Sequence, residues 1–376
     1  MNFTLNEEQE MLKKSAQDFL KNECSKKVLK ALEESETGFS RDLWGAMAEL
    51  AWMGIIIPEE YQGVGLSLLD LAILYEEYGR AAFNGPMLSS TMGTLAIMEG
   101  GPPELKEKFL PDLASGKLVL SWAMEELEVS YDPKFVSSQA ADKESQYLIN
   151  GTKLFVPYAS VSDYLLVVTR TKGNAGDEEG ITLFIVDSKA SGLRLTPMKT
   201  IGGDKQFQVD FENVSVAPED IVGTLNGGLP LVQSILDKAT AIQCAEMVGG
   251  AQYELEITAE YCRERVQFNR PIGTFQAVQH RLADMFVDVQ GARWTTYQAI
   301  WRICEGMPAQ REVAIAKIFT SNAIRRVAFS AQQLHAGMGY DLDHELHYYY
   351  RRAKALELKM GSILVELEAL GAELDL

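Results

Sequence analysis

The most informative segment of the sequence runs from Arg265 to Met285 and interrupts a long helical pattern. It begins with Arg265 and Phe268 and continues through Gln276, with a Pro and a Gly between them. A planar guanidinium binds phosphate oxygens in pairs and keeps its charge at any working pH. An Arg beside an aromatic residue is, on its own, most often a solvated helix residue, so the segment carries weight only as a whole.

A second segment with ligand-binding character runs from Gln333 to Tyr340 and carries Gly337 and Gly339. Glycine reaches backbone angles that other residues avoid, and it lets a ligand approach the main chain closely. On its own, this segment also fits a helix C-terminal cap followed by a turn. Its presence together with the Arg265 segment favours ligand binding.

Together the two segments resemble the signatures of the acyl-CoA dehydrogenase family, flavoenzymes that oxidise the Cα–Cβ bond of CoA thioesters. The resemblance implies an FAD whose pyrophosphate meets Arg265, with Phe268 and Gln276 as further cofactor-binding residues. It also implies that Gln333 and Gly337 reach the ADP portion of the cofactor across a subunit interface.

The region that corresponds to the family's flavin ring site departs from the family pattern. In the loop from Glu125 to Asp132, Glu126 and Asp132 match, but Glu125 replaces a hydroxyl residue and the usual glycine pair is absent. Phe155 can still pack on the flavin ring, whereas Pro157 replaces another hydroxyl residue. Proline offers neither a side-chain donor nor a backbone N–H. The resemblance therefore implies an altered ring site.

Removal of the α-proton of a thioester requires a carboxylate within hydrogen-bond reach of that proton. In most of the family a Glu supplies it, and the resemblance places Met360 at this position. Some relatives carry the Glu earlier, where counting back from Arg265 gives Ala239 or its neighbour Thr240. None of these side chains can abstract a proton, so no catalytic base is assigned.

Other carboxylates near these positions are candidates to replace the missing base. Glu246 lies two turns beyond Ala239 on about the same helix face, and its apolar flanks favour a paired structural carboxylate over a base. Glu357 lies one turn before Met360, where we expect it to be solvated at the surface. Weaker candidates occupy a polar turn: Asp341, Asp343 and Glu345. The His residues show no metal-ligand spacing, so no metal is expected.

Hydrophobic periodicity divides the chain into three parts that position these residues. Residues 1–116 are predicted to form helices, beginning after an Asn6 cap. Residues 117–226 contain short strands rich in β-branched and aromatic residues. Residues 227–376 return to four long helical patterns, at about 229–265, 274–306, 310–334 and 344–374.

The predicted fold class is α+β and multidomain. It combines an N-terminal helical domain, a middle β-barrel or β-sandwich domain and a C-terminal four-helix bundle. The acyl-CoA dehydrogenase family has the same order of domains, so the resemblance covers essentially the whole chain.

Composition sets further limits on the function. The length of 376 residues predicts two or three packed units. The formal net charge of −18 argues against a nucleic-acid-binding surface. No apolar run reaches transmembrane length, and no signal peptide or presequence is visible, which predicts a cytoplasmic protein. We expect the cysteines to be reduced core residues: Cys24, Cys244, Cys262 and Cys304.

These observations favour part of an FAD-dependent α,β-dehydrogenase of CoA thioesters, with a homologous subunit supplying the catalytic Glu. One alternative is a self-sufficient homotetramer with an atypical base or altered thioester chemistry, in which the backbone N–H of residue 360 serves as an oxyanion donor. Another is a non-enzymatic CoA-ester-binding protein. The expected partners are an acyl-CoA substrate, homologous or identical subunits of a tetramer, and an electron-transferring flavoprotein.

Overall fold

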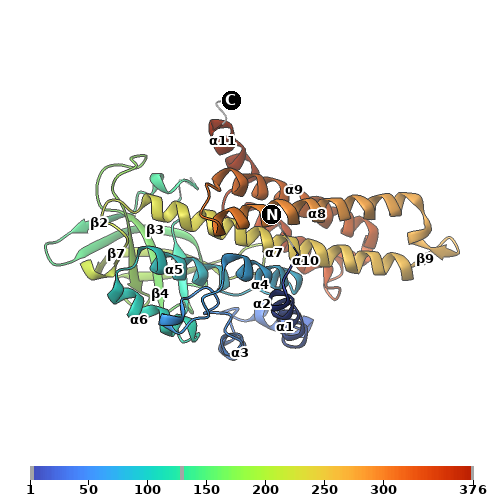
Figure 1. Ribbon diagram of the computed structural model, residues 1–376, viewed down its shortest axis with the longest axis horizontal. Helices are drawn as coiled ribbons and strands as arrows, with labels where there is room; N and C mark the ends of the chain where they lie inside the picture. The colour runs from blue at the N-terminus through green and yellow to red at the C-terminus, as the bar shows by residue number, and fades with distance from the viewer. Residues whose placement is uncertain (1–3, 128–130, 374–376) are drawn as a thin grey trace.

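A computed structural model describes residues 4–127 and 131–373 of the chain. Figure 1 shows the β region at one end of the long axis and the paired long helices reaching the other end. The predicted order of helices, strands and helices is confirmed. Residues 128–130, where the family glycine pair is missing, lie outside the described residues, as does the predicted helix end at 374.

The N-terminal region consists of helices that pack around an apolar core. The first begins as predicted, because the Asn6 side chain accepts a hydrogen bond from the backbone N–H of Gln9 at 2.8 Å in a capping box. The helices at 26–34 and 87–100 lie within the region 1–116 that was predicted to be helical. The helices are α1 (Glu7–Glu23), α2 (Lys26–Glu34), α3 (Arg41–Glu49), α4 (Leu68–Arg80), α5 (Met87–Gly100) and α6 (Pro103–Ala114).

The middle region forms one sheet with strand order β6-β7-β3-β2-β4-β5-β8, and β1 pairs in parallel with β4. The longest antiparallel pairing, between β3 and β7, lies on one side of this sheet. Short strands at 139–142, 193–198 and 221–222 were not predicted. The strands are β1 (Leu120–Ala123), β2 (Gln139–Asp142), β3 (Tyr147–Pro157), β4 (Tyr164–Arg170), β5 (Ile181–Asp187), β6 (Leu193–Met198), β7 (Gln206–Val216) and β8 (Ile221–Val222).

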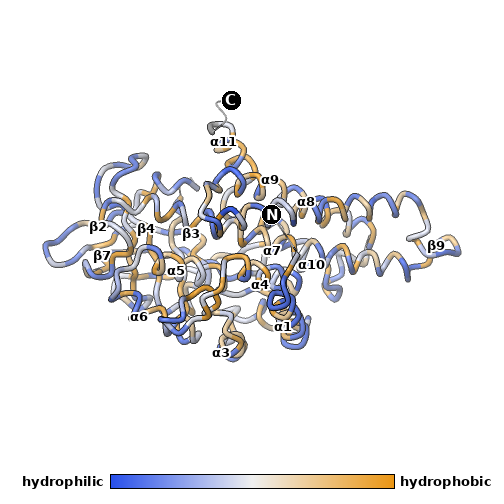
Figure 2. Tube along the Cα trace, viewed as in Figure 1, coloured by the Kyte–Doolittle hydropathy of each residue, from blue (hydrophilic) through white to orange (hydrophobic). Residues whose placement is uncertain are grey.

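Strand β4 is buried on both faces and joins two cores. Leu166 and Val168 belong to the apolar cluster shared with the N-terminal helices, whereas Leu165 and Val167 belong to the core of the sheet. Successive side chains of a strand point to opposite faces, which explains why the central residues 165–168 of this strand are all apolar. Figure 2 shows the same concentration of apolar residues along α4, α5 and the inner strands. The sheet is therefore packed firmly against the helices that frame the site.

The C-terminal region is a bundle of long helices: α7 (Leu229–Glu264), α8 (Gln276–Cys304), α9 (Gln310–His335), α10 (Leu346–Leu358) and α11 (Ile363–Glu373). The prediction of one helix over 344–374 was wrong. The chain leaves the helix at Met360 and Gly361, which both have positive φ angles, 60° and 101°. Helix α11 then projects away from the bundle (Figure 1).

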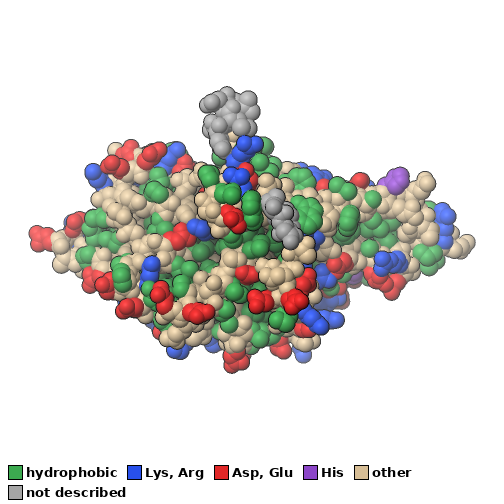
Figure 3. All heavy atoms as spheres, viewed as in Figure 1, with side chains coloured by type: hydrophobic (Ala, Val, Ile, Leu, Met, Phe, Trp, Pro, Cys, Tyr) green, Lys and Arg blue, Asp and Glu red, His purple; other side chains and the backbone are tan. Residues whose placement is uncertain are grey.

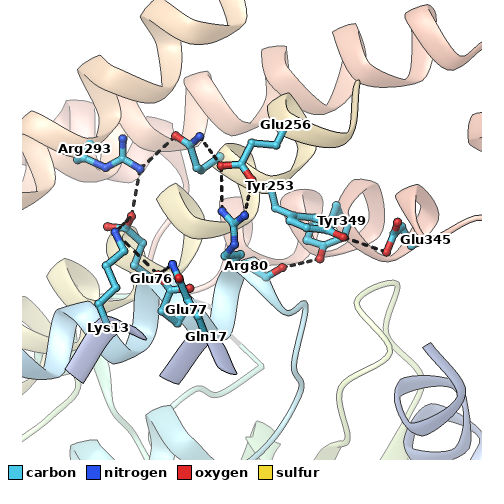
Figure 4. Close-up of polar contacts among 11 residues, drawn as sticks. Lys13, Gln17, Glu76, Glu77, Arg80, Tyr253, Glu256, Arg293, Glu345 and Tyr349 are labelled. Atoms are coloured by element: carbon cyan, nitrogen blue, oxygen red, sulfur yellow. Dashed lines mark hydrogen bonds and ion pairs between the residues drawn. The ribbon is translucent and has the colours of Figure 1, made fainter. Parts of the chain in front are cut away.

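A buried polar network joins the N-terminal helices to the bundle (Figure 4). Glu76 of α4 accepts hydrogen bonds from Arg293 Nη2 at 3.0 Å and from the Tyr297 hydroxyl at 2.9 Å, both on α8. Arg80 forms an ion pair with Glu256 of α7. Burial raises the pKa of Glu76, but the charges of Arg293 and other partners outweigh this effect and bring the pKa below its ordinary value. The network therefore holds the two helical regions in a fixed relation.

Acidic and basic side chains are interspersed on the face shown in Figure 3, with apolar side chains between them. Among the described helices, none has both the length and the apolar character that a membrane crossing requires. Three of the free cysteines are buried as expected, but Cys304 is exposed because it lies in the last turn of α8.

Candidate functional site

A cavity of about 370 Å³ lies where α4, α5, the β region, α7 and α10 meet. This volume is in the range of small-molecule and cofactor sites. Its wall is largely apolar, with a few charged groups placed among aromatic and aliphatic side chains. The apolar part includes Tyr75, Met87, Leu88, Met92, Trp122, Met124, Phe155, Pro157, Leu236, Leu356 and Met360.

The β-region wall of the cavity is fixed by a fully buried lysine. Lys153 of β3 donates from Nζ to Glu126 Oε1 at 2.6 Å and to the carbonyl oxygen of Met124 at 3.1 Å. Burial opposes ionisation, but the Lys153 charge and hydrogen bonds from Ser137 and Ser138 lower the pKa of Glu126 to about 2. The loop after β1 is thereby tied to β3, although its glycine pair is absent.

Phe155 and Pro157 both line the cavity, as the resemblance implied for residues facing a flavin ring. Phe155 has a positive φ of 51° and leaves 47% of its surface exposed. The register of β3 against β7 shifts between Lys153 and Val156, so the strand is irregular at this point. That irregularity turns an aromatic side chain toward the cavity.

Neither of the family's positions for the base provides a carboxylate in this cavity. Met360 lines the cavity and packs against the main apolar core. Ala239 is completely buried within that core, and Thr240 beside it is also buried. The two positions are thus occupied by side chains that cannot accept a proton.

Lys317 holds the backbone that leads to Met360. Its fully buried ammonium donates to the carbonyl oxygens of Leu356 at 2.8 Å and Lys359 at 2.7 Å, and to Gln243 Oε1 at 2.9 Å. A positive charge is favourable at the C-terminal end of a helix, where carbonyl groups lack partners. The end of α10 is therefore pinned to α7 and α9 beside the cavity. The sequence analysis had not singled out Lys317.

The two carboxylates considered as replacement bases both form ion pairs. Glu246 lines the cavity and is paired with Arg352 of α10. Glu357 was expected at the surface, but it is buried and paired with Lys354 at a distance of 3.1 Å. It is buried because α10 packs against α7 and α9 in the bundle. Both carboxylates therefore already have a cationic partner within the chain.

Glu125 is a cavity carboxyl that sequence reasoning counted only as a lost hydroxyl. It lines the cavity, and its Oε2 is buried without a hydrogen-bond partner among the described residues. Burial raises the pKa of Glu125 to about 7, although the Lys153 charge opposes the rise. Nearby, the Tyr131 hydroxyl donates to the carbonyl oxygen of Leu358 at 3.0 Å, joining the β region to α10. The sequence signal that could have identified Glu125 as a cavity residue was its position directly after an apolar strand.

The residues implied to bind pyrophosphate lie at the far end of the molecule (Figure 1). Arg265 ends α7 and is followed by a two-stranded ribbon, β9 (Val266–Gln267) and β10 (Arg270–Pro271), which had not been predicted. Phe268 and Asn269 form the turn of this ribbon. Their φ angles of 53° and 63° are both positive, as a type I′ turn requires. Arg265, Phe268 and Gln276 are all exposed.

The Gln333 segment lies at the same end of the bundle as Arg265. Gln333 and Gly337 are exposed at the end of α9 and in the short 3₁₀ helix Ala336–Tyr340. Tyr261, one turn before Arg265, stacks on His335 with ring centroids 4.3 Å apart. The structure thus places these two sequence motifs near each other, on an exposed surface that we term the tip.

The tip and the cavity are far apart within one chain. Glu246 lines the cavity and Arg265 follows the end of the same continuous helix, 19 positions later. At about 1.5 Å per residue, this corresponds to roughly 28 Å along the helix axis. The cofactor-binding residues implied by the sequence therefore fall into two separate groups, with Phe155 in the cavity and the others at the tip.

Three family models match the chain in the order of its regions. They are described as the N-terminal, middle and C-terminal domains of acyl-CoA dehydrogenase, and they match residues 6–117, 121–214 and 226–374. Among curated proteins, the 3-(aryl)acrylate reductase of Clostridium sporogenes is 31% identical over 375 residues, covering 98% of each chain.

Solved structures show the same similarity over the full length. The ChsE4-ChsE5 complex from Mycobacterium tuberculosis contains a chain that is 30% identical, with a TM-score of 0.92 and coverage of 100% of this chain and 99% of that chain. Butyryl-CoA dehydrogenase from Megasphaera elsdenii is 26% identical, with a TM-score of 0.92 and complete coverage of both chains.

Proposed function

The chain belongs to the acyl-CoA dehydrogenase family, and we propose that it works as one subunit of an assembly in which a homologous chain supplies the catalytic Glu. The predicted class of activity, FAD-dependent oxidoreduction of a CoA thioester, is confirmed by the family. The reliance on a partner is supported by one observation. Met360 lines the cavity at the position where the resemblance places the base, and Glu246, one of the carboxylates considered as a replacement, is paired with Arg352.

The residues of the cavity fit a planar, polar cofactor ring. The aromatic face of Phe155 is partly exposed to the cavity. On the same wall, Trp122 Nε1 and Glu125 Oε2 are buried without hydrogen-bond partners among the described residues. Buried polar groups are normally paired, so a ligand with ring heteroatoms would satisfy them. We assign this wall to the isoalloxazine ring of FAD, which accepts a hydride when bound.

This chain's own residues then position the thioester rather than remove its proton. Lys317 fixes the backbone at Lys359, so that the N–H of Met360 is available as a donor to the thioester oxygen. The apolar side chains of α4, α5 and α10 exclude water from the acyl group. The α-proton of that thioester would be removed by the Glu of the homologous subunit, which has to come within hydrogen-bond reach of it.

The second subunit is also proposed for a geometric reason. The ring and the pyrophosphate of FAD are joined by a short ribityl chain, which cannot span the roughly 28 Å between the cavity and Arg265. We therefore propose that each FAD lies between the cavity of one chain and the tip of another. The ChsE4-ChsE5 complex, to which this chain is similar, contains two different proteins, as its name states. We propose an electron-transferring flavoprotein as the electron acceptor and a cytoplasmic location.

The test is to purify the chain alone and together with a homologous subunit from the same source, and to record flavin absorbance with and without acyl-CoA. We expect substrate-dependent bleaching of the flavin only in the mixed assembly. Bleaching by the chain alone would instead support a self-sufficient homotetramer. Absence of flavin from both preparations would support a non-enzymatic binding protein.

Arg265→Ala tests the tip directly. Loss of a paired guanidinium–phosphate contact should raise the dissociation constant of FAD by about tenfold or more. The purified variant should therefore contain less FAD at equal protein concentration. The matched control is Arg263→Ala, because Arg263 lies two residues earlier and is occupied by Glu260 at 2.7 Å. Equal FAD content in both variants and the wild type would remove Arg265 from the cofactor site.

A further inference from the structure

Two residues that line the cavity each carry a buried polar atom without a hydrogen-bond partner among the described residues. Arg352 of α10 is paired with Glu246 through Nη2, but its Nη1 is buried without a hydrogen-bond partner among the described residues. Gln206 of β7 donates from Nε2 to Asp204 Oδ2 at 2.5 Å, and its Oε1 is likewise buried and unpaired. Arg352, Glu246, Gln206 and Asp204 all line the cavity. Arg352 and Gln206 thus supply one unpaired donor and one unpaired acceptor, besides Trp122 Nε1 and Glu125 Oε2 on the wall assigned to the flavin ring.

The two free atoms lie in one electrostatic cluster. Burial raises the pKa of Asp204, but Lys359, hydrogen bonds from Thr200 and Gln206, and the charge of Arg352 bring it below its ordinary value. Arg352 and Gln206 therefore both act on Asp204, one through its charge and the other through a hydrogen bond.

The charge balance of the cavity decides what kind of group this is. The charged residues that line it are three acids and two bases: Glu125, Asp204, Glu246, Arg352 and Lys359. The acids outnumber the bases, so the cavity has no excess positive charge with which to hold an anionic group of the acyl chain. An uncharged group that both accepts and donates a hydrogen bond fits better, and a hydroxyl group has this capacity.

We propose that the cavity selects CoA thioesters whose acyl chain carries a hydroxyl group, which accepts from Arg352 Nη1 and donates to Gln206 Oε1. The proposal rests on the proposed function and adds its substrate class. A purely aliphatic chain would leave both atoms buried and unpaired, which sites built for hydrogen bonding strongly disfavour. Arg352 and Gln206 thereby become specificity-determining residues, whereas the wall with Phe155 serves the cofactor.

The helical surroundings of Arg352 support its assignment to the acyl group. Glu246 and Arg352 come from α7 and α10, and Tyr75 and Tyr78 of α4 also line the cavity. The unpaired atoms assigned to the flavin ring instead belong to Trp122 and Glu125, at the end of β1. The two sets of unpaired atoms therefore come from different elements.

The experiment measures binding to the FAD-loaded assembly by calorimetric titration. The probes are straight-chain acyl-CoA thioesters and their terminally hydroxylated counterparts, in a series of matched chain lengths. We expect at least one hydroxylated thioester to bind about tenfold more tightly than its matched partner in the wild type. Equal or weaker binding of every hydroxylated thioester refutes the proposal. Tighter binding of the matched carboxylate-terminated thioester also refutes it, because it identifies an anion site.

Two variants locate the preference. Arg352→Lys keeps a cation beside Glu246 but removes the second guanidinium nitrogen, and it should reduce the preference to near unity. Gln206→Met should do the same by removing the acceptor. The matched control is Arg351→Lys, which changes the neighbouring arginine that pairs with Glu33 at 2.5 Å outside the cavity, and it should keep the preference.

The remaining outcomes are also decisive. If Arg352→Lys lowers FAD affinity and leaves the hydroxyl preference unchanged, the free nitrogen serves the cofactor and the proposal is wrong. If the wild type binds FAD and straight-chain thioesters but shows no preference, the substrate class is wrong and the proposed function stands. If no CoA thioester binds to the FAD-loaded assembly, the proposed function itself fails.

Discussion

Glu125→Gln should make the ligand-free chain more stable at alkaline pH. Burial in the cavity wall raises the pKa of Glu125 from an ordinary value of 4.5 to about 7, even though the charge of Lys153 opposes this. The folded chain therefore holds the Glu125 proton more tightly than the unfolded chain does. Gln has nearly the same shape and carries no charge at any pH.

The sign and size of the effect follow from linkage. Between pH 4.5 and about 7 the folded state binds more protons than the unfolded state at this residue, so its stability falls as the pH rises. The cost is complete above the folded pKa. At about 1.4 kcal/mol for each pH unit, it reaches at most roughly 3 kcal/mol. Glu125→Gln should escape this cost at pH 8 and have little advantage at pH 4.

The assay is urea unfolding of the ligand-free wild type and variant at both pH values, followed by circular dichroism. The difference between the two proteins isolates Glu125, because other buried acids such as Glu77 are present in both. Glu104→Gln, at an exposed position on α6, gives the baseline for removing a surface carboxylate. The reasoning is refuted if the free energy of unfolding of the variant, relative to that of the wild type, does not increase between pH 4 and pH 8.

Three further substitutions test other parts of the structure. Glu76→Gln should lower the free energy of unfolding by about 3 kcal/mol, because it replaces the buried carboxylate that pairs with Arg293; an unchanged urea midpoint near neutral pH would contradict this. That loss should shrink as the pH falls and the wild-type Glu76, whose pKa is lowered, becomes protonated. Lys317→Met should cost about 2–4 kcal/mol by leaving buried carbonyl groups unpaired, measured in the same way; a stable variant would show that water replaces the ammonium. Met360→Glu should accelerate acyl-CoA-dependent flavin bleaching by the chain alone by about a hundredfold, measured by stopped-flow absorbance; no acceleration would mean that residue 360 does not face the α-carbon.

Long periodic segments were predictable from the sequence because their burial follows one helix face or one strand pattern. Helix α7 is an example, and the Asn6 cap of α1 was identified from local chemistry alone. The break between α10 and α11 was missed because Met360 adopts a positive φ, which is uncommon for a residue with a side chain. Tertiary packing imposes that conformation.

The site was predictable only where a motif is contiguous. Arg265 and Gln333 were found in this way, whereas the cavity combines side chains from α4, β1, β3, β7 and α10. The Arg352 partner of Glu246 lies more than a hundred residues away in sequence, so no local pattern could reveal the pair. The burial of Glu357 was mispredicted for the same reason, because it depends on how α10 packs in the bundle.

The length of α7 between the cavity and the tip has a genetic consequence. In an assembly that shares each cofactor between chains, a substitution at the tip damages the neighbour's site, and a substitution in the cavity damages the chain's own. A tip variant and a cavity variant should therefore complement each other when co-expressed, because one of their mixed sites then combines an intact cavity with an intact tip. After a gene duplication, selection on one copy can keep its tip while its cavity drifts. A chain with Arg265 retained and Met360 in place of a carboxylate has the pattern that this history produces.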